Sequence, residues 1–421
     1  SPDSNSYVNH AKVGYKLSET SFSGNVTWER IGGTVDANSP HIAILTASEL
    51  DAATTFADYS LTNIPTSLVS GTTYSITWSA TDTVGNVSSA YINTPIYYDT
   101  TALTAVLSYS HYFAREDTVV TITATFNERA LPTPKIAIDY QGIDSDVGLT
   151  DMTIGSDSTV WTYTATIPGG EVNNGVVSVS VTTTDLAGNS LRASDITDTD
   201  TLVVDNTFPS AVITYSDSLV KENDNVTVTV TFNESVQLSP QIGIVYAGEA
   251  ELDTVDMVAT NDKIWTYGSV IIPDGNDGAA TVSIIAKDLG GNYLTNANTT
   301  NRTLLRVDNT HPTFSVLSPD SNSYVNHAKV GYKLSETSFS GNVTWERIGG
   351  TVDANSPHIA ILTASELDAA TTFADYSLTN IPTSLVSGTT YSITWSATDT
   401  AGNISADFIS TPVYYDTTSP T

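Results

Sequence analysis

The chain has 421 residues, which allows for about two to four domains, and 46 Asp and Glu against 15 Lys and Arg give it a net charge of −31. This surplus of carboxylates argues against nucleic acid and anionic membranes as partners. It favours cations, among them calcium, which takes oxygen ligands. The chain contains no cysteine, so disulfides and thiolate metal sites are excluded.

Short strands are the predicted elements along the chain. A single helical turn is expected at 46–53, with a copy near 362–370, and no segment has sustained helical periodicity. Alternating apolar and polar residues predict strands at 119–126, 226–232 and 391–397. Gly, Asn, Asp and Pro interrupt the strands about every ten residues, and about seven strands in roughly 100 residues is typical of an immunoglobulin-like sandwich.

Internal repeats define the domain organisation. Ser1–Thr83 recurs residue for residue as Ser318–Thr400, and between the two copies lie two further units that resemble each other. We therefore expect an all-β chain of four tandem immunoglobulin-like β-sandwich domains arranged as an extended rod. The expected domains are 1–99 (type A, its N-terminal strand truncated), 100–205 (type B), 206–308 (type B) and 309–421 (type A, with the start of the next linker). Because Ser1 begins inside a repeat, we expect a longer polypeptide.

Three acidic landmarks recur in every repeat. The first residue of an Asp-x-x-Gly-Asn motif, called the turn Asp, is Asp82, Asp185, Asp288 or Asp399. The Asp of a later Asp-(Thr/Asn)-Thr motif, called the linker Asp, is Asp99, Asp205, Asp308 or Asp416. The Glu that follows a strand ending in Leu-Ser or Phe-Asn, called the strand-end Glu, is Glu19, Glu128, Glu234 or Glu336. Pro209, Pro312 and Pro420 follow three of the linkers and indicate domain boundaries.

The ordered set of landmarks resembles the bacterial Ig-like repeats of giant Gram-negative surface adhesins. The resemblance rests on Leu17-Ser-Glu19 and Phe126-Asn-Glu128, on Asp-x-x-Gly-Asn and on the Val/Tyr-Asp-(Thr/Asn)-Thr linkers, and it covers essentially the whole chain. It implies stacked sandwiches on a long stalk, with calcium at the domain junctions. The linker after Asp99 lacks the family's proline, so the first junction departs from the pattern.

The topology of an immunoglobulin-type sandwich also brings the landmarks together. The strand-end Glu and the turn Asp belong to loops at the N-terminal pole of a domain, and the preceding linker Asp arrives at the same pole. Carboxylates that converge without a cation repel one another, and calcium removes that cost. The predicted calcium sites are Asp99 with Glu128 and Asp185, Asp205 with Glu234 and Asp288, and Asp308 with Glu336 and Asp399.

Two further carboxylate sets are incomplete, and the Asp-x-x-Gly-Asn motif has an alternative interpretation. Glu19 and Asp82 form a half-site without a preceding linker Asp, and Asp416 is the reverse half. The alternative is that Asp-x-x-Gly-Asn is only a turn, in which Asp accepts nearby backbone N–H groups and Gly takes a positive φ. The acidic loop at Asp139, Asp144 and Asp146 is expected to be solvated.

Catalytic patterns are missing from the sequence. No histidine has the spacing of a metal motif, and no nucleophile elbow, P-loop or dinucleotide fingerprint occurs. Acidic pairs that repeat in every unit favour a structural role over glycoside hydrolysis. The sequence therefore predicts no catalytic residue, and we expect that the protein is not an enzyme.

Three functions fit these observations. The first is the stalk of a large bacterial cell-surface adhesin, which is extracellular and stiffened by Ca²⁺ at its junctions. The second is a subunit of a self-assembling extracellular filament, sheath or surface layer, and the third is a carbohydrate-binding accessory region of a secreted enzyme. The expected partners are neighbouring repeats of the same polypeptide and, in the second case, lateral copies of the chain.

Overall fold

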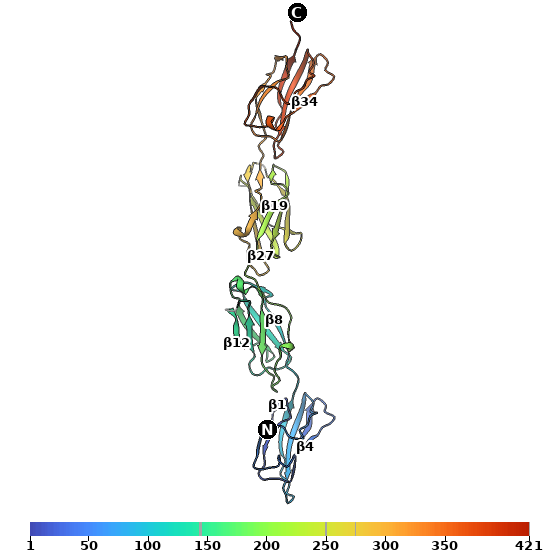
Figure 1. Cartoon of the computed structure of the whole chain (residues 1–421), viewed down its shortest axis with the longest axis vertical. Helices are drawn as coiled ribbons and strands as arrows, with labels where there is room; N and C mark the ends of the chain where they lie inside the picture. Colours follow the sequence, from blue (N-terminus) through green and yellow to red (C-terminus); the bar gives the residue numbers. More distant parts are fainter. Residues whose placement is uncertain (143–144, 249–250, 274, 421) are drawn as a thin grey trace. The chain divides into compact units, whose positions relative to one another are not determined.

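The structure is a computed structural model, and it describes residues 1–142, 145–248, 251–273 and 275–420. The chain divides into two compact units, Ser1–Thr207 and Phe208–Thr421, and this division falls close to the predicted boundary after Asp205. In the described residues, strands alternate with loops and short helical turns throughout both units (Figure 1). The prediction of tandem all-β sandwiches is confirmed, whereas the domain limits and the extended rod stay predictions.

The first repeat, 1–99, consists of a five-stranded sheet facing a two-stranded one. The order in the larger sheet is β1-β7-β6-β3-β4, and β2 pairs with β5. The strands are β1 (Ser6–Val8), β2 (Val13–Lys16), β3 (Ser23–Gly33), β4 (His41–Ile44), β5 (Thr55–Tyr59), β6 (Thr72–Thr81) and β7 (Tyr91–Tyr98). All neighbours are antiparallel except β1 and β7, which are parallel.

The second repeat, 100–205, has sheets in the orders β13-β14-β10-β8-β17, β12-β11-β16 and β15-β18-β9. Its strands are β8 (Ala105–Tyr109), β9 (Phe113–Ala114), β10 (Val119–Phe126), β11 (Lys135–Asp139), β12 (Val147–Asp151), β13 (Thr153–Ile154), β14 (Val160–Thr166), β15 (Gly175–Val176), β16 (Ser178–Thr182), β17 (Ile196–Asp198) and β18 (Val203–Val204). In the described part of this repeat, the 3₁₀ turns η2 (Glu171–Asn173) and η3 (Ala193–Asp195) lie between strands.

The third repeat, 206–308, has the same pattern of sheets, in the orders β24-β25-β21-β19-β28, β23-β22-β27 and β20-β29-β26. Its strands are β19 (Ala211–Tyr215), β20 (Leu219–Val220), β21 (Asn225–Phe232), β22 (Val236–Val245), β23 (Glu251–Asp256), β24 (Val258–Ala259), β25 (Ile264–Ile271), β26 (Gly278–Ala279), β27 (Thr281–Asp288), β28 (Thr299–Asn301) and β29 (Arg306–Val307). One 3₁₀ turn, η4 (Asn296–Asn298), precedes β28.

The fourth repeat, 309–421, has the same sheets as the first, together with one strand whose residues 314–317 precede the counterpart of Ser1. Its sheets have the orders β31-β37-β36-β33-β34 and β30-β32-β35. The strands are β30 (Phe314–Ser318), β31 (Ser323–Val325), β32 (Val330–Leu334), β33 (Ser340–Gly350), β34 (His358–Ile361), β35 (Phe373–Tyr376), β36 (Thr389–Thr398) and β37 (Phe408–Tyr415). The strand that begins before this counterpart is β30, which pairs with β32.

Alternation along the strands places one face of each strand in a core. In β6, every second side chain is buried, among them Tyr74, Ile76 and Trp78. In the described part of the chain, the buried apolar side chains form four clusters, one in each predicted repeat. Burial of this apolar surface is the dominant stabilising contribution to the fold.

The predicted helical turn is present, but its two copies differ. In the fourth repeat it is a 3₁₀ turn, η5 (Ala364–Glu366), closed by a capping box between Thr363 and Glu366. In the first repeat, the same sequence forms hydrogen-bonded turns without a helix, although Thr46 and Glu49 make the equivalent hydrogen bonds. Among the described residues, none of these turns is long or apolar enough to cross a lipid bilayer.

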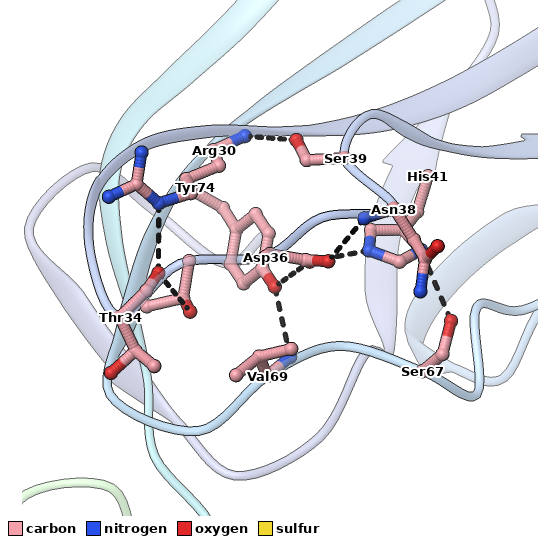
Figure 2. A network of polar contacts seen from close by, with 10 residues as sticks. Arg30, Thr34, Asp36, Asn38, Ser39, His41, Ser67, Val69 and Tyr74 are labelled. Atoms are coloured by element: carbon pink, nitrogen blue, oxygen red, sulfur yellow. Dashed lines mark hydrogen bonds and ion pairs between the residues drawn. The ribbon is translucent and has the colours of Figure 1, made fainter.

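A buried polar network connects two loops of the first repeat with strands β4 and β6 (Figure 2). Asp36 accepts hydrogen bonds from the Tyr74 hydroxyl and from His41 Nε2, both at 2.6 Å. Tyr74 in turn accepts the amide of Val69 at 3.0 Å, and Ser67 Oγ lies 3.3 Å from His41 Nδ1. Burial opposes the ionisation of Asp36, but these hydrogen bonds outweigh it and lower its pKa. The fourth repeat contains the same network around Asp353.

Two adjacent glycines in β3 allow a test of the backbone conformation next to this network, with one glycine as the control for the other. Gly33 has a φ of +70°, and a Cβ at this position would fall against the carbonyl oxygen of Gly71. For Gly32, the nearest atom to an added Cβ is 3.8 Å away. Gly33→Ala should therefore lower the free energy of unfolding of the first repeat by about 1–3 kcal/mol. Gly32→Ala should change it by less than about 1 kcal/mol, and calorimetry of both variants would reveal equal effects if the steric argument is wrong.

Candidate metal centre

The turn Asp is fixed by its own motif. Asp185 Oδ1 accepts the amides of Ala187 and Asn189 at 2.8 and 2.9 Å, and its Oδ2 accepts the Asn189 side chain at 2.8 Å. Gly188 supplies the positive φ of 90° that closes the turn. Hydrogen bonds of the same kind surround Asp82, Asp288 and Asp399. The turn chemistry of the alternative interpretation is thus present in all four repeats.

The linker Asp is positioned by the last strand of its repeat and by a neighbouring loop. The amide of Asp99 donates to the carbonyl oxygen of Val8 at 2.9 Å, which extends the pairing of β7 with β1. Asp99 Oδ1 accepts the Thr101 amide at 2.8 Å and the Ser70 hydroxyl at 2.9 Å. Asp416, at the end of β37, is held in the same way by Ser387 and Thr418.

The strand-end Glu follows β10 or the corresponding strand of its repeat. Asn127 fixes the end of β10, because its Oδ1 accepts the amide of Thr104 at 2.8 Å. Its Nδ2 donates to Glu128 Oε1 at 3.4 Å. In the third repeat, Asn233 bonds in the same way to the amide of Ser210 and to Glu234.

The structure brings together two of the predicted calcium sets, one in each compact unit. Within each set, one carboxylate oxygen per residue lies within 4.8 Å of the others. The turn Asp is 2% exposed in both sets, and the other two carboxylates are half-buried. The two sets are Asp99 with Glu128 and Asp185, and Asp308 with Glu336 and Asp399.

The remaining predicted residues form no such set within one unit. Asp205 belongs to the first compact unit, whereas Glu234 and Asp288 belong to the second, so their convergence stays a prediction. Among the described residues, no third carboxylate joins Glu19 and Asp82, and Asp416 is likewise outside any set of three. In the acidic loop, Asp146 accepts the amide of Tyr140, and Asp144 lies outside the described residues.

The electrostatics of the two sets favour a bound cation. Burial and the neighbouring charges of Asp99 and Asp185 raise the pKa of Glu128. Burial, together with the charges of Asp308 and Asp399, raises the pKa of Glu336 in the same manner. Hydrogen bonds to Asp99 outweigh its burial and lower its pKa. Because hard divalent cations are bound by clustered carboxylate and carbonyl oxygens, the donor set fits Ca²⁺.

Sequence analysis missed a residue next to each linker. Ser70, Asn174, Asp277 and Ser387 all directly precede a glycine with positive φ. Asp277 accepts the amide of Asn309 and the hydroxyl of Thr310, both at 2.8 Å, and its charge contributes to the raised pKa of Glu336. The shared signal is a small polar residue before a glycine, ahead of the last strand of each repeat.

Asn189 adds a direct contact between the turn and the linker. Its Nδ2 donates to the carbonyl oxygen of Asp99 at 2.9 Å, and its Oδ1 accepts Asn9 Nδ2 at 3.2 Å. Asn403 makes the same bond to the carbonyl oxygen of Asp308 at 2.7 Å. The sequence indicates this Asn only as a turn residue, and the structure shows that it also bonds to the linker of the preceding repeat.

This contact can be tested with a matched pair of variants. Asn189→Ala removes bonds to Asp185, Asp99 and Asn9, and should cost about 1–2 kcal/mol more than Asn86→Ala, which removes the side-chain bond to Asp82. Thermal unfolding in chelator compares the two without metal. Equal losses for the two variants would mean that the contact with the linker contributes nothing.

Comparison with known proteins finds only distant likenesses. No protein-family model matches the chain, and no curated protein is significantly similar to it. A tetra-tandem repeat from the extending region of a large adhesion protein is 19% identical, with 96% of this chain and 98% of that chain covered and a TM-score of 0.30. The Escherichia coli adhesin FdeC is 12% identical, with coverages of 75% and 98% and a TM-score of 0.34. Three N-terminal domains of the outer capsid protein Hoc of bacteriophage RB49 are 12% identical, with coverages of 76% and 100% and a TM-score of 0.40.

Proposed function

We propose that the chain is part of the stalk of a bacterial surface adhesin, in which Ca²⁺ bound between consecutive repeats stiffens the array. The observation that carries the proposal is the convergence of a linker Asp, a strand-end Glu and a turn Asp in both compact units. A linker Asp comes from one repeat and the other two carboxylates come from the next. A cation bound by all three would therefore restrict bending between them.

The composition supports a spacer rather than a catalyst. The identical segments Ser1–Thr83 and Ser318–Thr400 add length without adding a new kind of surface. A net charge of −31 keeps neighbouring stalks apart. In this proposal the chain is extracellular, has no catalytic residue and has its own neighbouring repeats as its principal partners.

Calcium titration and small-angle X-ray scattering test the proposal together. Calorimetric titration should show saturable binding of Ca²⁺, and Glu128→Gln with Glu336→Gln should weaken binding at these two sites at least about tenfold, because each of them loses one of its charged ligands. Glu19→Gln is the matched control, since this Glu ends the same kind of strand without a linker Asp in its set. The maximum dimension should be sharply defined with calcium and broadened with chelator. A chain that neither binds Ca²⁺ nor responds to chelator would refute the proposal.

Lateral assembly is a second candidate, and it is favoured by one edge of the larger sheet in the type A repeats. Ile42 and Ile44 on β4 are exposed, as are Ile359 and Ile361 on β34. An exposed apolar edge strand is a template for pairing with another chain. Sedimentation velocity over a range of concentrations separates the two candidates, because a stalk segment should remain monomeric and a filament subunit should associate.

A further inference from the structure

The two type B repeats share one architecture but differ in one part of their surface. Their three-stranded sheets have the equivalent orders β12-β11-β16 and β23-β22-β27. A shallow groove of about 500 Å³ lies beside the second of these sheets, in the third repeat. Its lining residues are separate from the candidate metal centre, so the groove needs an explanation of its own.

Three apolar side chains and an ammonium group line the groove. Leu238 is 87% exposed, and Ile285 and the Tyr293 ring are each about half exposed. The Lys287 ammonium lies over this ring, 4.2 Å from its centroid. The residues of the second repeat at the equivalent positions are Pro132, Thr182, Ser190 and Thr184. The aromatic ring, the aliphatic side chains and the ammonium are thus particular to the third repeat.

The backbone of β22 turns Leu238 towards solvent. The register of β22 against β27 shifts between Gln237 and Gln241, and Leu238 lies in this irregular stretch with a φ of +50°. A positive φ is uncommon for a residue other than glycine, and a bulge changes the direction of a side chain. An apolar side chain that is exposed by an unfavourable backbone conformation indicates a contact surface.

Two amides and one carboxylate complete the groove. Gln241 Nε2 donates to Asp256 Oδ1 at 3.0 Å, and Gln237 also lines the groove. In the second repeat, the same positions as Gln241 and Asp256 hold Lys135 and Asp151, which form an ion pair at 2.6 Å. A neutral amide therefore stands beside the carboxylate of the groove, where the second repeat has a lysine. A carboxylate can accept several hydrogen bonds, so this one can also accept from a ligand.

We propose that this groove binds a neutral carbohydrate chain. The C–H face of a pyranose ring would pack against the three apolar side chains, the aromatic ring among them. The hydroxyl groups around the sugar would bond to the Asp256 carboxylate, the Gln241 amide and the Lys287 ammonium. Apolar contacts with a few polar groups that fix orientation are typical of small-molecule sites of this size.

Polarity and charge favour this ligand over other occupants. An apolar segment of another protein would remove water from the Asp256 carboxylate and the Lys287 ammonium without pairing either of them. An acidic polysaccharide would be repelled by the net charge of −31. A neutral saccharide avoids both costs, because its hydroxyl groups both donate and accept hydrogen bonds.

Saturation-transfer-difference NMR on the whole chain tests the site with maltotriose, cellotriose, mannotriose, galactotriose and chitotriose as probes. At least one of them should bind saturably, and Tyr293→Ser should weaken its binding by about fivefold or more, because the sugar loses an aromatic contact. Ile285→Thr should also weaken it. Both substitutions introduce the residue that the second repeat has at the same position, so the fold is expected to accept them.

The matched control is Leu149→Thr, which removes a 60% exposed apolar side chain from β12 of the second repeat and should leave binding unchanged. All titrations are run in chelator, so their outcome is independent of calcium and of the proposed stalk function. Trigalacturonate, the acidic comparison, should bind more weakly than the best neutral probe.

Four results would overturn the proposal. They are no saturable binding of any neutral probe, equal binding by the Tyr293→Ser and Ile285→Thr chains, tighter binding of trigalacturonate, and an equal loss of binding in Leu149→Thr. Sedimentation velocity adds a fifth outcome. Self-association of the chain that Tyr293→Ser abolishes would assign the groove to a second copy instead of a carbohydrate.

Discussion

Asp36→Ala should lower the free energy of unfolding of the first repeat by about 2–4 kcal/mol, because it removes a buried carboxylate and leaves its hydrogen-bond donors unsatisfied. The side chain of Asp36 is fully buried and accepts the Tyr74 hydroxyl, His41 Nε2 and the Asn38 amide. Its loss leaves two buried side-chain donors without their acceptor, and this desolvation is not recovered. Burial and the bond to Asp36 raise the pKa of Tyr74 to about 12, so its hydroxyl remains a donor at neutral pH.

Calorimetry of the whole chain measures this effect with an internal reference. The first repeat should unfold at a lower temperature, while the fourth repeat, with the same network around Asp353, should not move. Asp151→Ala is the control, because Asp151 forms an exposed ion pair with Lys135 at 2.6 Å and should contribute less than about 1 kcal/mol. If Asp36→Ala costs no more than Asp151→Ala, the buried network does not stabilise the fold.

Calcium should stabilise the chain at neutral pH and lose this effect as the pH falls through the raised pKa values of Glu128 and Glu336. Each Glu must be ionised to bind a cation, so protons compete with calcium for the site. A raised pKa in the metal-free folded state also means that this state binds its proton more tightly than the unfolded state does. Acidification over this range therefore protonates and stabilises the metal-free folded state, and this protonation is what weakens calcium binding. The stabilisation by calcium, measured as the difference between the chain with calcium and with chelator, decreases as a result.

The unfolding temperature is measured with calcium and with chelator, from neutral pH down to about pH 4.5. The difference between the two temperatures reports the stabilisation by calcium at each pH. In the Glu128→Gln, Glu336→Gln double variant, the difference at neutral pH should be smaller than in the unsubstituted chain, because two of the predicted sites have lost a charged ligand. A difference that is constant with pH in the unsubstituted chain would show that calcium, if bound, does not use these two carboxylates.

Strand positions could be read from the sequence because they depend on local alternation. The predicted strand at 119–126 is β10, and those at 226–232 and 391–397 lie within β21 and β36. The helical turn predicted near 362–370 is a 3₁₀ helix, whereas the one predicted at 46–53 has the same capping bonds without a helix. Such a short turn depends on small differences in its surroundings that the local sequence does not contain.

The contacts of the candidate site could likewise be predicted only in part. The landmarks predicted that Asp99, Glu128 and Asp185 would meet, because the topology of a sandwich determines which loops share a pole. The position of Asp277 before a glycine could be read from the sequence, but its approach to the third linker could not, since the loop sequence does not specify the loop's neighbours. The contacts of Asp36 with His41 and Tyr74 join a loop to strands β4 and β6, and they become visible only when these strands are placed.

The parallel pairing of β1 with β7 determines how a type A repeat responds to being pulled from both ends. Ser6–Val8 lies near the beginning of the repeat and pairs with Ile96–Tyr98 at its end, so tension applied to the two ends draws these strands in opposite directions along their length. The hydrogen bonds between them, including the bond from Asp99 to Val8, are then loaded in shear and must break together rather than one after another. β31 and β37 repeat this arrangement in the fourth repeat. Tension that reaches these two strands of a type A repeat is therefore resisted by their hydrogen bonds in shear.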